Sequence, residues 1–451
     1  MNLSRRTFGA VRVGALSCCL VVFLAGCSFL EAERTQQVEH HVHEGRAPTY
    51  PLPTSVSHVA WEWSTEEEDG NLWEVLPGRS GPMMVLGTGV VGLDGTTGEE
   101  LWSYRVDSGG LHQVRPTPDH DRVLLTRPGH EPDTAVLLDA GTGQLIAEHT
   151  SGVGASFAQA SALTSDVAVV VPSGKEGPVE AFSLREGEQV WTYEPPQREG
   201  SDGVVVEEAV SAGETVVLIA AYNDGTLQDD SVDLHEQGML VVGLDEATGK
   251  PLWEVEQEFH SDMRRVAEYE LSPNAEALFL DVGAGNQRYK FLIDPATGKE
   301  IDGEAYQEQE RYPVGLLDDG YVETAADYDK EVVDYWRMSF QGQELARVET
   351  RLRSAEGDLD RGVPLEEGVL RLDHLTEPDL DRGPVYAEFE WWDGKEDPVV
   401  LNADMTVNEQ WWGRSEGTAL TLPDAPVTAL VPGAVVITEE SSAPWTVAGL
   451  T

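Results

Sequence analysis

The chain has 451 residues, and 30 Lys and Arg against 81 Asp and Glu give it a formal charge of -51 at pH 7. Such a negative field repels nucleic acid, which we exclude as a partner. The three cysteines, Cys18, Cys19 and Cys27, all lie near the N-terminus, so the remainder can form neither a disulfide nor a thiolate metal site. The 45 Gly, 25 Pro and 12 Trp indicate strands joined by tight turns.

The first 26 residues are typical of an export signal. No acidic residue precedes Glu31, and a basic stretch is followed by an apolar run from Val13 to Leu24. This run is shorter than the about 20 residues of a transmembrane helix. It ends in Leu24-Ala25-Gly26-Cys27, which resembles the lipobox of bacterial lipoproteins. We expect residues 1–26 to be removed and Cys27 to carry the lipid; the alternative is an ordinary signal peptide with an incidental cysteine.

Two arginines within the signal bear on the export route. Arg5 and Arg6 lie in Ser4-Arg5-Arg6-Thr7-Phe8, which resembles the twin-arginine export motif. That route carries proteins that have already folded. Alternatively, the pair is the basic flank of a general secretory signal. Either route places the protein on the cell membrane, lipid-anchored and facing outside the cytoplasm.

Residues 27–54 follow the signal and lack the periodicity of a core element. We expect them to be the lipidated cysteine and a flexible polar tether to a folded domain at residues 55–451. His40, His41 and His43 lie in this tether and could take up zinc or copper. We favour a polar tether that contains some histidines, and we expect no metal site.

One pattern repeats along residues 55–451: an apolar strand, the turn Asp-x-x-Thr-Gly, and a strand that often carries Trp. The Asp side chain can accept a hydrogen bond from a backbone amide two or three residues on, and the Gly supplies the positive φ that closes the hairpin. The Trp can bury about 200 Å² against a neighbouring sheet. Clear copies begin at Asp94, Asp139, Asp245 and Asp294, a weaker one begins at Ser183, and degenerate copies lie at Phe340–Gln343 and near Asn402–Asp404, ahead of Trp411 and Trp412.

The repeat length predicts a β-propeller. The first five turns are spaced 45, 44, 62 and 49 residues apart, which is the size of a four-stranded blade. The C-terminal Trp445–Thr451 matches Val90–Asp94, which precedes a turn, and Val59–Trp63 looks like the Trp strand that should follow one. We therefore predict that Val59–Trp63 pairs with strands between Val427 and Leu450 and closes the ring without a free edge. Seven internal turns and this composite blade give eight blades, with seven as the alternative.

The sequence Asp-x-x-Thr-Gly-x-x-Leu-Trp resembles the tryptophan-docking repeat of pyrroloquinoline-quinone-type β-propellers, over about residues 55–451. That superfamily includes quinoprotein dehydrogenases and the lipoprotein propeller of the outer-membrane β-barrel assembly machinery. Resemblance to the dehydrogenases implies a bound quinone, a Ca²⁺ and often a vicinal disulfide, but no cysteine remains here to form one. Resemblance to the assembly factor implies one subunit of a larger complex.

We expect a non-enzymatic propeller that binds a protein or ligand in the cell envelope, with no cofactor and no catalytic residue. The alternative is a quinoprotein dehydrogenase that uses pyrroloquinoline quinone and Ca²⁺. Two acidic loops, Gly357–Gly362 and Pro378–Gly383, each place two carboxylates at positions i and i+2, which could share a Ca²⁺. Neither has the full ligand spacing of a calcium loop, so we expect solvated turns.

Overall fold

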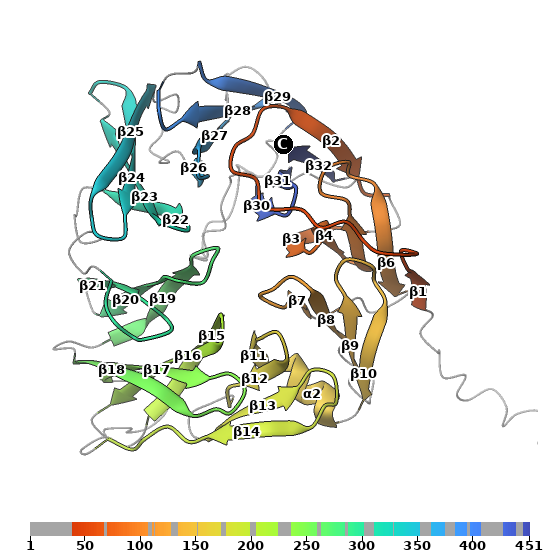
Figure 1. The fold of residues 1–451 in the computed structure, drawn as a ribbon, viewed down its shortest axis with the longest axis vertical. Helices are drawn as coiled ribbons and strands as arrows, with labels where there is room; N and C mark the ends of the chain where they lie inside the picture. The colour runs from red at the N-terminus through yellow and green to blue at the C-terminus, as the bar shows by residue number, and fades with distance from the viewer. Residues whose placement is uncertain are drawn as a thin grey trace, which may run out of the picture.

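A computed structural model shows a closed ring of eight β-sheet blades around a common axis (Figure 1). The prediction of a single all-β propeller with eight blades is confirmed. The structure describes residues 38–66, 70–106, 111, 113–127, 134–150, 152–172, 177–198, 204–223, 236–258, 263–284, 287–301, 311–327, 329–351, 362–374, 384–394, 397–406, 427–438 and 445–451.

Every blade is an antiparallel sheet, and the first strand of each blade is nearest the axis (Figure 1). From the axis outward, blade 1 contains β3 (Leu72–Gly78), β4 (Gly81–Leu86), β5 (Gly89–Leu93), β6 (Glu100–Val106) and, outermost, β1 (Val38–His41). Blade 2 contains β7 (Gln113–Pro116), β8 (Arg122–Arg127), β9 (Thr134–Asp139) and β10 (Leu145–Thr150), and it is followed by the helix α2 (Gly152–Ala158). Blade 3 contains β11 (Ala160–Leu163), β12 (Val167–Val170), β13 (Val179–Ser183) and β14 (Gln189–Tyr193). Blade 4 contains β15 (Val204–Ala212), β16 (Thr215–Asn223), β17 (Glu236–Asp245) and β18 (Pro251–Glu258).

The second half of the ring repeats this order. Blade 5 contains β19 (Met263–Leu271), β20 (Leu278–Ala284) and β21 (Gln287–Ile293), with a bridge from Ile293 to Glu300. Blade 6 contains β22 (Tyr312–Leu316), β23 (Gly320–Asp327), β24 (Val332–Ser339) and β25 (Glu344–Arg351). Blade 7 contains β26 (Gly362–Pro364), β27 (Gly368–His374), β28 (Pro384–Trp391) and β29 (Val399–Thr406). Blade 8 contains β30 (Val427–Val431), β31 (Ala434–Thr438), β32 (Thr446–Leu450) and the N-terminal β2 (Val59–Ser64).

The hydrophobic core lies between blades. Each buried cluster joins two neighbouring blades, and together the clusters occupy all eight seams of the ring. Alternate residues of a middle strand face opposite seams: Met83 of β4 packs against blade 2, and Met84 packs against blade 8. Middle strands are therefore apolar on both faces, which gives them nearly continuous runs of apolar residues.

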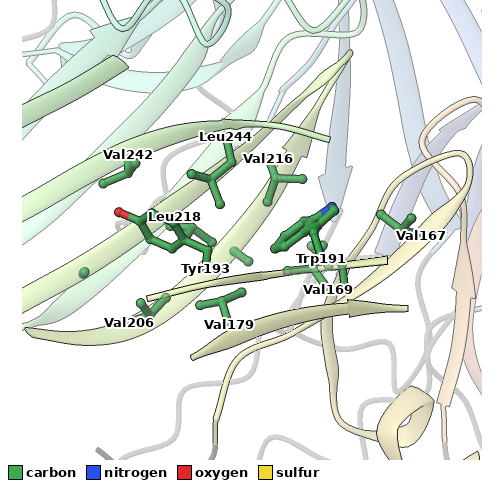
Figure 2. Close-up of a cluster of buried hydrophobic side chains, with 14 of the residues drawn as sticks. Val167, Val169, Val179, Trp191, Tyr193, Val206, Val216, Leu218, Val242 and Leu244 are labelled. Atoms are coloured by element: carbon green, nitrogen blue, oxygen red, sulfur yellow. The ribbon is translucent and has the colours of Figure 1, made fainter. Parts of the chain in front are cut away.

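Figure 2 shows the seam between blades 3 and 4. Trp191 of β14 lies among Val167 and Val169 of its own blade and Val216 of β16. Tyr193, two residues further along β14, faces Leu218 of the next blade. A single outer strand thus contributes two aromatic side chains to one seam.

The Asp-x-x-Thr-Gly turns adopt the predicted geometry. Asp94 Oδ1 accepts hydrogen bonds from the backbone N of Thr96 at 2.9 Å and of Thr97 at 3.0 Å. The Gly98 amide donates to the Asp94 carbonyl at 2.8 Å, and Gly98 has a φ of 70°. The predicted positive φ is confirmed at the other clear copies, Gly143, Gly249 and Gly298. The weaker copy has a positive φ at Gly187, and the degenerate copy at Phe340–Gln343 has one at Gly342.

Five of the turns also receive a side chain from the blade before them. A ring N–H on the fourth strand from the axis points to the carbonyl oxygen of the second turn residue, and the ring lies against the turn glycine. The Nε–O distances are 2.8 Å for Trp61 to Gly95, 3.0 Å for Trp102 to Ala140, 2.7 Å for Trp191 to Glu246, 2.9 Å for Trp253 to Pro295, and 2.9 Å for His149 to Leu184. We call these five interactions the docking contacts.

A second small residue makes room for each indole. Trp102 pairs across the strands with Gly92, where an added Cβ would lie 2.2 Å from the indole nitrogen. Gly243 and Gly449 have the same relation to Trp253 and Trp61. In blade 2 the corresponding residue is Leu137, and it pairs with Ala147 in place of a Trp. The docking side chain is then His149, two residues further along the same strand.

The predicted composite blade is confirmed. β2 pairs antiparallel with β32, with Trp61 opposite Gly449 and Trp63 opposite Val447. Because Trp61 also docks on the first turn of blade 1, the N-terminal strand both completes blade 8 and joins it to blade 1.

The prediction of a free tether was wrong for residues 38–54. β1 pairs with β6, and residues 42–58, which we call the strap, cross blades 2, 1, 8 and 7 before β2 begins. The strap is held by backbone and side-chain hydrogen bonds: His43 N to Thr142 O at 2.9 Å, Ser80 Oγ to Pro48 O at 2.7 Å, Tyr50 OH to Asp94 Oδ2 at 2.9 Å, Gly433 N to Pro51 O at 2.9 Å, and Glu367 N to Thr54 O at 2.9 Å. These bonds give a polar segment a fixed path without an apolar pattern of its own.

The turn expected near Asn402–Asp404 was also misplaced. Those residues lie within β29, and the turn of blade 7 is at Gly394, which has a φ of 60°. The turn was misplaced for two reasons. It lacks the Thr-Gly ending of the other copies, and Trp391 and Trp392 come before it rather than after it.

Removal of a docking side chain should weaken the ring. We expect Trp61→Ala to lower the free energy of unfolding by about 3–5 kcal/mol, because it empties a buried site and leaves the Gly95 carbonyl without its donor. Trp73→Ala is the matched control: Trp73 is 57% exposed, so its loss should change stability by less than about 0.5 kcal/mol. Urea unfolding of both variants measures the difference, and equal midpoints would contradict this account of ring closure.

Candidate functional site

The candidate site lies at the axis of the ring, where the first strands of the blades converge (Figure 1). We call Glu74 of β3, Arg115 of β7, Glu207 and Glu208 of β15, and Tyr269 of β19 the axial cluster. These side chains come from blades 1, 2, 4 and 5. Strands at the centre of a propeller carry polar residues because one edge of the sheet faces the axis rather than another blade.

Arg115 connects the members of the cluster. Its Nη1 donates a hydrogen bond to the carbonyl oxygen of Ala160 in β11, so the guanidinium reaches from blade 2 to blade 3. Its charge also acts on Glu74, Glu208 and Tyr269, which belong to three further blades. One cationic side chain therefore acts on groups from four other blades.

Burial has the largest effect on the pKa values of the Glu74 and Glu208 carboxyls. Burial raises the pKa of Glu208, and the neighbouring charge of Glu207 raises it further, against the opposing effects of the Ala209 amide and Arg115. Burial likewise raises the pKa of Glu74, and Arg115 offsets part of this increase. The pKa of Tyr269 is raised by burial and by the charge of Glu208. For both Glu74 and Glu208, the effect of burial on the carboxyl pKa is thus larger than the opposing effect of Arg115.

Exposed aromatic side chains accompany these charges on the first strands. Tyr269 is 45% exposed, and Trp73, next to Glu74, is 57% exposed. Tyr312, at the start of β22, is 52% exposed. The first strands thus carry large exposed rings as well as partly buried carboxylates, and rings left in solvent provide flat apolar faces suited to binding.

Glu270 makes a different contribution. Burial raises the pKa of its carboxyl, and the hydrogen bond that Oε1 accepts from the Leu316 amide at 2.8 Å offsets part of this increase. Because Leu316 belongs to blade 6, Glu270 of β19 ties blades 5 and 6 together near the axis. Its side chain is therefore a structural link beside the cluster.

The residues singled out from the sequence do not meet at this site. Cys27, Arg5, Arg6 and most of the two acidic loops lie outside the described residues. His40 of β1 is at the outer edge of blade 1, with Nε2 2.7 Å from the Gly143 carbonyl oxygen and its ring against Tyr104. His41 is paired with Glu39 at 2.9 Å. Within the described ranges, no group of three or more His, Cys, Asp or Glu could hold a metal ion.

Sequence reasoning missed the axial cluster because its members are not linked by a motif. Each is a single charged or aromatic residue in a short strand, and only the order of strands within the blades brings them together. The sequence contains part of the signal needed to find the cluster. Glu74, Arg115 and Glu208 are charged residues within the segments that come first in their repeats. No helix in the described part of the chain is long and apolar enough to span a bilayer.

Comparison with known proteins gives one family. The family model for "Outer membrane protein assembly factor BamB" matches residues 87–339, which is more than half of the chain. No curated protein matches. Among solved structures, BamB from Moraxella catarrhalis is 14% identical with a TM-score of 0.43, covering 88% of this chain and 100% of that one. The WD40 domain of SCAP from fission yeast is 10% identical with a TM-score of 0.44, covering 92% and 98%.

The raised pKa of Glu208 predicts a pH-dependent cost. A carboxyl whose pKa is higher in the folded state binds its proton more tightly there, so its ionised form destabilises the fold above that pKa, and the cost fades as the pH falls. We expect Glu208→Gln to raise the urea midpoint at about pH 7.5 and to raise it less at about pH 5. Glu99→Gln, at an exposed turn position, should produce no such trend. A gain from Glu208→Gln that is independent of pH would argue against burial of an ionised carboxylate.

Proposed function

Because the chain belongs to the family of the outer membrane protein assembly factor BamB, we propose that it is a lipid-anchored propeller that binds protein partners in the cell envelope and catalyses no reaction. The observation that carries this proposal is the combination of exposed aromatic rings and partly buried carboxylates on the first strands. A rigid ring held by eight inter-blade clusters presents these side chains in a fixed arrangement, which reduces the entropy lost on binding.

The pairing of β1 with β6 limits how a lipid at Cys27 would hold the propeller. Val38, where β1 begins at the outer edge of blade 1, is only 11 positions after Cys27. An extended chain of this length reaches at most about 36–40 Å. The outer edge of blade 1 would then stay close to the membrane, with blade 5 on the opposite side of the ring directed away from it (Figure 1).

Anchoring can be tested by fractionation. In the native host, Cys27→Ala should either release the protein to the soluble fraction or leave an uncleaved precursor, because the thiol that accepts the lipid is gone. Cys19→Ala, within the signal, is the matched control and should leave a processed protein on the membrane. Finding Cys27→Ala as a processed chain in the membrane fraction would refute lipid anchoring.

Partner binding is tested separately. Crosslinking of the intact protein in its own membrane, followed by purification, should recover at least one envelope protein in reproducible ratio to it. The protein exported without its lipid should recover the same partner more weakly, since anchoring raises the local concentration. Recovery of the propeller alone under both conditions would contradict the proposed role.

The quinoprotein alternative makes an opposite prediction. We expect no heat of binding above background when pyrroloquinoline quinone and Ca²⁺ are titrated into the purified chain, and no dye reduction with simple alcohols or sugars. Stoichiometric quinone binding accompanied by dye reduction would replace the scaffold proposal with a dehydrogenase.

A further inference from the structure

Blade 1 shows how an outer strand of this propeller binds an additional extended segment. β1 lies beside β6 as a fifth strand, with His40 directly opposite Tyr104. The His40 ring packs edge-on against the Tyr104 ring, with 5.3 Å between the ring centroids. Its Nε2 lies 2.7 Å from the carbonyl oxygen of Gly143, which belongs to the turn of the next blade. Backbone pairing thus holds the segment, and one imidazole contacts both the outer strand and the following turn.

The outer strands of six blades can be compared residue by residue, because each pairs with the third strand of its blade in the same register after a β-bulge. We call the residue directly after the docking Trp, or after the residue in its place, the edge position. Through blades 1, 2, 3, 4, 6 and 8, the edge position is Ser103, Glu148, Thr192, Glu254, Arg347 and Glu62. The four charged residues are exposed, and such charges on an edge strand disfavour pairing with another strand. Only blades 1 and 3 of these six lack this protection.

Blade 3 shares the features of the occupied edge of blade 1. In both outer strands the edge position lies within a Trp-x-Tyr sequence, and the turn of the next blade ends in a glycine with positive φ, which is Gly249 for blade 3. The two edges differ in what covers them. Ser103, alongside β1, is fully buried, whereas Thr192 is exposed and Val190 is 46% exposed. Among the described residues, no strand pairs with the outer edge of β14.

The backbone of β14 is oriented to accept a further strand. In blade 1 the Val106 N–H donates toward the inner strand β5 at 2.8 Å. Because successive residues of a strand direct their N–H and C=O groups to opposite sides, those of Ser103 and Arg105 point outward to β1. The registers of blades 1 and 3 are the same, so Thr192 and Glu194 correspond to these two residues. Their backbone groups are therefore directed away from β13.

Glu194 determines which charge the added segment should carry. The corresponding residue of blade 1 is Arg105, and it lies opposite Glu39 of β1. Opposite charges directly across a pair of strands stabilise the pair, and like charges destabilise it. Because Glu194 reverses the sign, the residue that faces it should be Lys or Arg. The residue that faces Tyr193 should be His, as in β1.

We propose that the outer edge of β14 binds an extended segment of a protein partner as a fifth strand of blade 3, with Lys or Arg opposite Glu194 and His opposite Tyr193. Strand addition obtains its affinity from main-chain hydrogen bonds and its specificity from alternate side chains. This inference rests on the proposed function, in which the partner is a protein. It adds the mode by which that partner is bound and the place on the ring.

The test uses two labelled peptides with blocked ends. The glutamate peptide has the sequence of residues 36–42, and the lysine peptide is the same with Glu39→Lys. Fluorescence anisotropy with the full chain in detergent should show the lysine peptide binding about threefold or more tightly than the glutamate peptide. The exchange Glu194→Lys in the protein should reverse this preference. The change His40→Ala in the lysine peptide should weaken its binding by about threefold or more, because the ring N–H is lost.

A second pair of variants tests the backbone. Thr192→Pro removes the outward N–H and should weaken the lysine peptide by about tenfold or more. It should leave the urea midpoint unchanged, since this N–H makes no bond to β13. Thr192→Val is the matched control at the same position, and it should bind the lysine peptide within about twofold of the unaltered protein because it retains the N–H. Glu194→Lys tests the same edge without any change to the backbone.

Four outcomes would overturn the inference: no binding of the lysine peptide to the unaltered protein, an unchanged preference in Glu194→Lys, equal binding by the Pro and Val variants of Thr192, or a preference of the unaltered protein for the glutamate peptide. The last would indicate exchange with β1 beside Arg105 of blade 1. Recovery of an envelope partner that is unaffected by Thr192→Pro would retain the proposed function and reject this edge.

Discussion

The fold depends on contacts between blades more than on contacts within them. Each blade has two apolar faces, and only its two neighbours can bury them. The docking contacts all run the same way around the ring. In each, a ring N–H from an outer strand of one blade donates to a carbonyl oxygen in the turn of the next blade. A blade without its neighbours would expose both faces, so the ring is expected to fold and unfold as a unit. Rigidity at the axis follows, because the first strands are positioned by the same seams.

The last three seams are built differently. Between blades 6 and 7, the fully buried Arg371 donates to Thr350 Oγ1 and to the Arg351 carbonyl, and lies 3.6 Å from Glu388. Removal of one member of such a network would leave a buried charge without its partner, which is far more costly than loss of an exposed pair. Across the region where the chain ends meet, the strap adds hydrogen bonds to blades 7, 8, 1 and 2. Among the described residues, the seams between blades 6 and 7 and between blades 7 and 8 thus carry polar contacts and no docking contact, whereas the strap bonds to blades 1 and 2 accompany docking contacts.

The turns could be predicted from sequence because their chemistry is local. An Asp that bonds its own backbone and a Gly that takes a positive φ are visible within five residues, and blade 8 followed from matching the two chain ends. His149 could not be found by spacing, because its role depends on Leu137 excluding an indole on the neighbouring strand. The path of the strap depends on single hydrogen bonds to four blades, and the axial cluster depends on which strands meet at the centre. These features arise from tertiary structure. Neither the strap nor the axial residues have a periodic pattern in the sequence from which their positions could be predicted.

A double-mutant cycle on Trp253 and Gly298 tests the docking account most directly. An added Cβ at Gly298 would lie 2.4 Å from the Trp253 ring, and the φ of 67° at Gly298 disfavours any side chain. If docking is as described, Gly298→Ala should cost several kcal/mol in the native chain and only the backbone strain of about 1 kcal/mol when Trp253→Ala is already present. Trp191 docks on a different turn, so the cost of Gly298→Ala should be the same in the Trp191→Ala variant as in the native chain. Additive costs for Trp253 and Gly298 would show that the two residues do not interact, and would contradict the account.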